Sequence, residues 1–191
     1  MQYPNLKDYI AVLDGVLPHS VCDKILEEYA NSGEWGDTLV GSNGIGDVRK
    51  DIRSATTIPM SADFVIDRNA ELRRELDSDV FAGASKAIQE YNKRFERSEI
   101  EQDSGYELLR YETGQFYTQH VDSFKARPRA VSCSFALNDD YEGGEFGFFD
   151  RELVIKAPKG GAVLFPSGFM YPHEIMPVTK GTRYSIITWF I

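Results

Sequence analysis

The sequence is poor in several residue types, and each shortage narrows the functions open to it. Only two cysteines occur in 191 residues, Cys22 and Cys133, which are too few and too scattered for a disulfide framework or a zinc knuckle. Basic residues are outnumbered by acidic ones, 21 against 30, and the formal net charge is -9. This balance repels phosphate backbones and argues against a general nucleic-acid binder, although a local basic groove is not excluded.

Long apolar runs are also missing, since no segment is long enough to span a bilayer. The N-terminus has no basic region leading into an apolar stretch, so the sequence predicts no secretory signal and no membrane partner. We expect a protein of a reducing compartment, the cytoplasm. With 42% hydrophobic residues the chain can bury one sizeable core, so residues 1–191 are expected to form a single domain of undetermined oligomeric state.

The first half of the chain has the apolar periodicity of helices. Spacings of three and four predict an amphipathic helix from about residue 17 to Ser32-Gly33, and one long helix, or two separated at 77–79, over residues 72–95. Residues 9–13 indicate a first strand, residues 33–46 a loop or weak hairpin, and residues 51–60 a β-like stretch. Residues 1–105 are therefore expected to supply helical support and the first strands.

From Tyr106 onward, short β-like segments alternate with turns. They span residues 106–111, 129–137, 144–148, 152–156, 162–165 and 182–191. Helices followed by many evenly spaced strands predict an α+β, mainly β fold. We expect a jelly roll (double-stranded β-helix) over residues 106–191, with N-terminal helices buttressing one sheet.

Candidate metal ligands are few, because the chain contains only three histidines. His120 and Asp122 stand two residues apart in a β-leaning, aromatic-rich stretch, so an imidazole and a carboxylate would leave the same face of a strand. His173 is the histidine that remains downstream, whereas His19 lies at a predicted helix start and is expected to be exposed or to cap the helix, with no chemical role. Two imidazoles and one carboxylate form the ligand set of non-haem Fe(II) oxygenases, but a chance surface pair is the commoner explanation for His-x-Asp alone.

Arg183 stands ten residues beyond His173. If the two lie on neighbouring antiparallel strands joined near residues 178–181, they come back opposite each other and the guanidinium lies beside the metal. A planar guanidinium there suits a bidentate bond to a carboxylate. Pairing of Arg183 with a structural acid remains the alternative. Two other residues have plain interpretations: Arg53, taken alone, as a surface charge, and Glu145 as a turn carboxylate after paired glycines.

Three segments in this order and spacing resemble the Fe(II)- and 2-oxoglutarate-dependent dioxygenases, most closely the prolyl 4-hydroxylase branch. They are Leu-Arg-Tyr111-x-x-Gly114-x-x-Tyr117-x-x-His120-x-Asp122, Leu137-Asn-x-x-Tyr141-x-Gly143-Gly144-Glu145, and His173-Glu-x-x-Pro-Val-x-x-Gly-x-Arg183 followed by Trp189. The resemblance covers residues 106–191. A weaker similarity lies in residues 12–17 and at Arg53-Ser54.

The resemblance implies an enzyme that binds Fe(II) through His120, Asp122 and His173 and uses O2, with ascorbate as a further candidate cofactor. Oxidative decarboxylation of 2-oxoglutarate to succinate and CO2 would be coupled to hydroxylation of an unactivated C–H bond. Two competing classes remain, a non-catalytic jelly-roll binding module and a zinc enzyme that does not use 2-oxoglutarate. The intact set of ligand residues argues against the binding module.

The resemblance also assigns residues to the cosubstrate. Arg183 would bind the distal carboxylate of 2-oxoglutarate, helped by the Tyr111 hydroxyl, and Trp189 would line the same pocket. Prolyl hydroxylases usually carry lysine where this chain has Arg183. Arg183-Tyr184-Ser185 is similar to the Arg-x-Ser of other branches, so Ser185 is a candidate second partner of the carboxylate.

Tyr117 and Arg53 would face the primary substrate, again as the resemblance implies. Peptidyl proline is the first candidate substrate, because the prolyl branch has the most similar motifs. The arginine at position 183 weakens that choice, so a free amino acid or another small molecule is the alternative.

Overall fold

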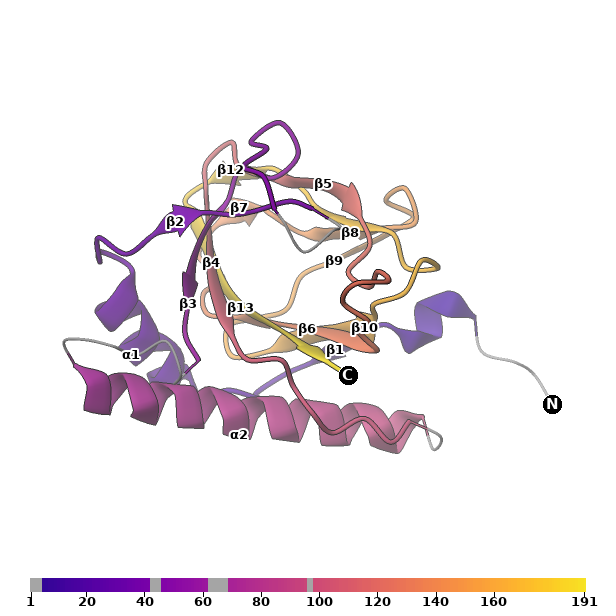
Figure 1. Ribbon diagram of the computed structural model, residues 1–191, viewed down its shortest axis with the longest axis horizontal. Coiled ribbons are helices and arrows are strands. Elements are labelled where there is room, and N and C mark those ends of the chain that lie inside the picture. Colours follow the sequence, from indigo (N-terminus) through magenta and orange to yellow (C-terminus); the bar gives the residue numbers. More distant parts are fainter. Residues whose placement is uncertain (1–4, 42–45, 62–68, 96–97) are drawn as a thin grey trace.

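The computed structural model describes residues 5–41, 46–61, 69–95 and 98–191. Two antiparallel sheets face each other, and the long helix α2 runs along the outer side of the larger one (Figure 1). The larger sheet has the strand order β1-β10-β6-β13-β4-β3-β2, and the smaller has the order β5-β11-β8-β9. A two-stranded pair joins β12 to β7. The arrangement is mostly sheet with helices outside one face, as the sequence predicts.

The strands are short. The larger sheet consists of β1 (Ala11–Leu13), β2 (Gly36–Asp37), β3 (Thr56–Pro59), β4 (Glu107–Glu112), β6 (Val131–Ala136), β10 (Ala162–Pro166) and β13 (Thr182–Phe190). The smaller sheet consists of β5 (Tyr117–His120), β8 (Phe146–Phe148), β9 (Leu153–Ile155) and β11 (His173–Ile175), and the pair of β7 (Glu142–Gly143) and β12 (Val178–Lys180). The helical segments are the 3-10 helix η1 (Leu6–Tyr9), α1 (His19–Tyr29) and α2 (Ala70–Arg94).

Helix α2 is one continuous helix, which decides between the two predicted alternatives. Leu76 and Val80 flank the polar residues 77–79 and are both fully buried, so the apolar face is uninterrupted at that point. Further along the same face, Ala84, Ile88 and Tyr91 are also buried. They belong to a core shared with Leu108, Phe135 and Leu164 of the larger sheet. None of the described helices is both long and apolar enough to cross a membrane.

A second core lies between the two sheets and is rich in aromatic residues. Phe146 and Phe148 of β8 are buried together with Phe165 of β10, and Phe148 and Phe165 meet edge to face with ring centroids 4.9 Å apart. Tyr111 of β4 belongs to the same cluster. Bulky rings on both inner faces therefore hold the sheets together around the pocket described below.

Some predicted boundaries are wrong. The first strand was expected over residues 9–13 but covers only β1, because a capping box between Asn5 and Asp8 starts the 3-10 helix η1 just before it. Helix α1 ends at Tyr29 rather than at Ser32-Gly33, and the Tyr29 carbonyl accepts a 2.9 Å hydrogen bond from the Trp35 indole. Of the loop predicted over residues 33–46, residues 42–45 lie outside the described chain.

Substitution of Gly143 tests how closely β7 and β12 pack against each other. Its φ of +75° is unfavourable for other residues, and a Cβ atom there would clash with the Pro177 carbonyl oxygen and lie 2.8 Å from the Thr179 nitrogen. We expect Gly143→Ala to lower the free energy of unfolding by more than about 2 kcal/mol, since backbone strain and a backbone clash add. Gly114→Ala is the control, because its φ is +86° but nothing lies within 4 Å. Equal losses in chemical denaturation would contradict the clash.

Candidate metal and 2-oxoglutarate site

Three side chains from two adjoining segments form a cluster that can hold a metal ion. His120 ends β5, Asp122 follows two residues later, and His173 begins β11, where it pairs directly with His120. One ligand atom from each residue lies within 4.8 Å of the others. Asp122 Oδ1 is 3.4 Å from His120 Nε2, and Asp122 Oδ2 is 3.7 Å from His173 Nε2. The prediction that His120 and Asp122 share a strand is wrong, because Asp122 lies past the end of β5.

Both imidazoles are oriented in the same way. His120 Nδ1 is 2.9 Å from the Thr118 carbonyl oxygen, and His173 Nδ1 is 3.1 Å from the Tyr171 carbonyl oxygen. A carbonyl can only accept, so each Nδ1 carries a hydrogen, and Nε2 on the Asp122 side is the ring atom left to bind a metal. Two imidazoles and one carboxylate at this spacing fit a divalent transition metal such as Fe(II).

The protonation states also suit a metal. Burial alone would raise the pKa of Asp122, but His173, His120 and a hydrogen bond from Ser132 hold that pKa well below its ordinary value. Burial lowers the pKa of His173 to about 4, against the attraction of Asp122. At neutral pH the carboxylate is therefore ionised and His173 is neutral, which are the forms that bind metal ions.

Ser132 of β6 supports the carboxylate from the larger sheet. Its hydroxyl donates a 2.6 Å hydrogen bond to Asp122 Oδ2 and lies 2.8 Å from the Ser167 hydroxyl. We expect Ser132→Ala to weaken Mn(II) binding by about tenfold or more in a calorimetric titration, because partners of metal ligands fix their orientation. Thr188→Val is the matched control, since the Thr188 hydroxyl is buried and has no hydrogen-bond partner. An unchanged affinity in Ser132→Ala would show that this bond does not position the ligand.

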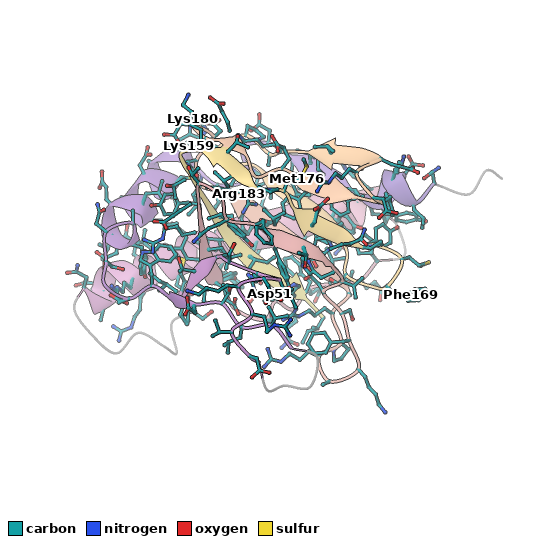
Figure 2. The ribbon with its side chains drawn as sticks, turned by 90° about the horizontal axis from the view of Figure 1, so that it is seen from above. Asp51, Lys159, Phe169, Met176, Lys180 and Arg183 are labelled. Carbon is teal, nitrogen blue, oxygen red and sulfur yellow. The ribbon has the colours of Figure 1, made fainter. Side chains whose placement is uncertain are left out.

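Arg183 lies across the pocket from the histidines. The prediction of neighbouring strands for Arg183 and His173 is wrong: Arg183 belongs to β13 in the larger sheet, whereas the neighbours of β11 are β5 and β8. The two residues still line one cavity of about 290 Å³, because their sheets face each other. Figure 2 shows Arg183 among the strands inside the molecule, and Lys180, three residues earlier, at its edge.

The surroundings of Arg183 suit an anionic ligand. Its side chain is buried, and its Nη1 donates a 2.8 Å hydrogen bond to Ser185 Oγ. Tyr111 pairs with it across β4 and β13, and the guanidinium carbon lies 5.3 Å from the centre of the Tyr111 ring. Within the described part of the chain no acid forms an ion pair with Arg183. The alternative in which Arg183 pairs with a structural aspartate or glutamate is therefore not supported by these residues.

The remaining predicted site residues also line this cavity. The Tyr117 ring stacks on the His120 ring at 3.5 Å, and the Arg53 guanidinium lies 4.7 Å above Tyr117. Trp189, on β13 like Arg183, lies beneath the guanidinium of Arg129 at 3.4 Å. Arg53 is therefore a half-buried residue of the cavity. The interpretation of Arg53, taken alone, as a surface charge is wrong.

The structure agrees with the prediction that Glu145 and His19 have no role in the site. Three other residues of the site were not predicted from the sequence. Glu145 is absent from the cavity lining, and His19 Nε2 lies 2.9 Å from the Lys159 carbonyl oxygen, away from the site. Ser132, Ser167 and Arg129 gave no sequence signal, because an isolated serine or arginine near a strand has no characteristic spacing. A basic run in residues 125–129, beside the ligand pair, was the one available hint for Arg129.

Comparisons with known proteins agree with this geometry. The sequence model of the 2OG-Fe(II) oxygenase superfamily matches residues 106–191. The chain is 35% identical over 94 residues to a PKHD-type hydroxylase of Alteromonas mediterranea, covering 42% of this chain and 40% of that protein. It is 42% identical over 67 residues to human prolyl 3-hydroxylase 2, covering 32% and 10%. The matches thus span about two fifths of the length of the PKHD-type relatives.

Solved structures share the fold. A prolyl hydroxylase from Trichoplax adhaerens, in complex with a hypoxia inducible factor oxygen degradation domain peptide fragment, superimposes with a TM-score of 0.77 at 21% identity, covering 95% of this chain and 83% of that one. A Pseudomonas putida prolyl-4-hydroxylase gives 0.70 at 21% identity, with coverage of 95% and 91%. The predicted jelly roll with helices is therefore confirmed, and the match over residues 106–191 agrees with the resemblance to the oxygenase family. The His120, Asp122 and His173 cluster suits the predicted Fe(II).

Proposed function

We propose that this chain, whose residues 106–191 match the sequence model of the 2OG-Fe(II) oxygenase superfamily, is a 2-oxoglutarate-dependent hydroxylase acting on peptidyl proline. The observation that carries the proposal is the convergence of His120, Asp122 and His173 on one side of a cavity that has Arg183 on the other. A candidate cation site and a buried guanidinium that has no acidic partner among the described residues suit a metal together with a dicarboxylic cosubstrate.

The chain supplies binding and orientation. Bound Fe(II) supplies the oxidative chemistry, in which O2 converts 2-oxoglutarate to succinate and CO2 and one oxygen atom enters a C–H bond of the substrate. His120, Asp122 and His173 hold the metal and leave further coordination positions open. Ascorbate is the reductant that would keep the metal ferrous.

The cosubstrate and the acceptor occupy different parts of the cavity in this proposal. Arg183 binds the distal carboxylate of 2-oxoglutarate, with Ser185 holding the guanidinium in place and Tyr111 beside it. Tyr117 and Trp189 offer ring surfaces to the acceptor near the metal ligands. Arg53 holds the Tyr117 ring from its other side or contacts the acceptor directly.

Peptidyl proline is the proposed acceptor because the names of several relatives and structural neighbours refer to prolyl hydroxylases, one of them solved with a peptide. A free amino acid or another small molecule is the second candidate, favoured by arginine rather than lysine at position 183.

Two experiments test the proposed function. Anaerobic addition of Fe(II) and 2-oxoglutarate is expected to produce a weak visible charge-transfer band, and neither a zinc enzyme nor a metal-free binding module would give one. In air, succinate release measured against proline-containing peptides and free amino acids separates the two acceptor classes. Absence of the band would contradict the cofactor assignment, and turnover only with free amino acids would contradict a peptide acceptor.

A further inference from the structure

The cavity contains more positive charge than the cosubstrate requires. Besides Arg183, it is lined by Arg53, Arg127 and Arg129, in a protein whose formal net charge is -9. The ion pairs found between described residues include none of these arginines. Arg127 is exposed, but Arg53, Arg129 and Arg183 are wholly or partly buried, so one cavity holds three such guanidiniums to which a ligand could offer a carboxylate.

Arg53 is held in place but its charge is not neutralised. Its Nε is buried without a hydrogen-bond partner, and its guanidinium carbon lies over the Tyr117 ring. Burial disfavours the charged form of Arg53, but Tyr111, Tyr117 and Glu107 favour it, and its pKa is raised. None of these contacts is an ion pair with a carboxylate. The geometry therefore fixes the position of this cation beside the metal ligand His120, on which Tyr117 stacks.

Arg129 is held in the same manner and also lines the cavity. Its guanidinium lies 3.4 Å from the centre of the Trp189 ring, and its Nη1 donates a 3.0 Å hydrogen bond to the backbone oxygen of Asp122. Burial lowers the pKa of Arg129, but arginine stays charged at neutral pH. One donor is used on a neutral carbonyl, and the remaining donors of the planar fork suit a carboxylate.

The two cations act on the same part of the cavity. Burial raises the pKa of Tyr117 to about 12, and the charges of Arg53 and Arg129 both oppose this rise. Glu107 is the acid that attracts both arginines, although it forms an ion pair with neither of them among the described contacts. Asp37, also in the lining, is paired with Lys50 at 3.1 Å. Asp122 attracts Arg129 as well, but its carboxylate belongs to the metal cluster. Apart from that cluster, Arg53 and Arg129 therefore share Glu107 as their acid near Tyr117.

We infer that the acceptor carries a carboxylate next to the residue that is hydroxylated, and that Arg53 and Arg129 bind it. This inference rests on the proposed function and narrows its substrate class to acidic acceptors. The carboxylate comes from a C-terminus or from an aspartate or glutamate side chain beside the proline. The charge preference is local, because the net charge of the whole protein disfavours the approach of an anion.

Matched pairs of acceptors test the inference. Mn(II) in place of Fe(II), with 2-oxoglutarate, allows binding to be measured by calorimetry without turnover. Acetyl-proline against acetyl-prolinamide tests a C-terminal carboxylate, and acetyl-prolyl-aspartate amide against its asparagine counterpart tests a side chain. We expect the charged member of at least one pair to bind about tenfold more tightly, as a charged hydrogen bond allows. Equal binding within both pairs would overturn the inference.

Substitutions of Arg53 and Arg129 test whether these residues cause the preference for a charged acceptor. Arg53→Gln and Arg129→Gln should each remove most of it, whereas Arg53→Lys and Arg129→Lys should keep part of it because the charge remains. Glu107→Gln should strengthen binding of the charged acceptor. Arg110→Gln is the matched control, since Arg110 also lies over an indole ring, that of Trp35 at 4.4 Å, but outside the cavity. A preference that survives in the double variant of Arg53 and Arg129 would also overturn the inference.

Failure of this inference and failure of the proposed function give different results. If only the inference fails, the anaerobic charge-transfer band is present and neutral acceptors release succinate as well as acidic ones. If the proposed function fails, neither the band nor succinate release is seen with any acceptor.

Discussion

Asp122→Ala is expected to weaken metal binding by more than about a hundredfold and to abolish succinate release. Removal of a partner of a ligand typically costs ten- to hundredfold in metal affinity, so removal of the ligand itself should cost more. Asp122 is also the only acid in the cluster, and its carboxylate lies beside both imidazoles. Calorimetric titration with Mn(II) measures the affinity, and a coupled succinate assay measures turnover.

The fold should survive this substitution. Asp122 lies past the end of β5, and the ladder partners of β5 do not depend on its side chain. Asp122→Asn is the matched variant, since it keeps the shape and removes the charge. It should bind metal weakly as well, while circular dichroism of both variants stays like that of the parent. Unchanged succinate production in Asp122→Ala would remove this residue from the site.

Arg183→Ala is expected to raise the KM for 2-oxoglutarate by about a hundredfold or more while metal binding persists. Loss of a charged hydrogen-bonding partner in a desolvated pocket costs about 2–5 kcal/mol, and tenfold in affinity corresponds to about 1.4 kcal/mol. Arg183 is 5% exposed, so water cannot replace the guanidinium fully. The measurement is the dependence of succinate release on 2-oxoglutarate concentration.

Two related variants separate charge from geometry at this position. Arg183→Lys should retain part of the affinity, because a lysine keeps the charge but not the planar fork. Ser185→Ala should cause a smaller loss, since its hydroxyl only orients the Arg183 Nη1. A KM for 2-oxoglutarate that is unaltered in Arg183→Ala would place the carboxylate elsewhere in the cavity.

Local patterns predicted the elements well, because each pattern depends on residues that are close in sequence. The apolar stripe through Leu76, Val80 and Ile88 specifies one face of α2 whatever packs on it. The alternating segments after Tyr106 likewise correspond to strands of the jelly roll, with limits that shift by one or two residues. The candidate metal cluster could be proposed from the sequence because the chain has only three histidines, one of which stands two residues from an aspartate.

Long-range pairing was not predictable in the same way. The expectation for Arg183 assumed a hairpin with β11, but β13 pairs with β4 and β6, and the facing of two sheets brings the side chains together. Nothing near residue 132 in the sequence indicates that its hydroxyl will meet Asp122. Such contacts depend on sheet order, which is decided by the packing of the whole core and not by any single segment.

The most direct test of the central claim is the anomalous scattering of crystals grown with Mn(II) and 2-oxoglutarate. The account predicts one manganese peak bonded to His120 Nε2, His173 Nε2 and an Asp122 carboxylate oxygen, with a carboxylate of 2-oxoglutarate on the Arg183 guanidinium. A manganese peak at other residues, or a cosubstrate that does not contact Arg183, would contradict it.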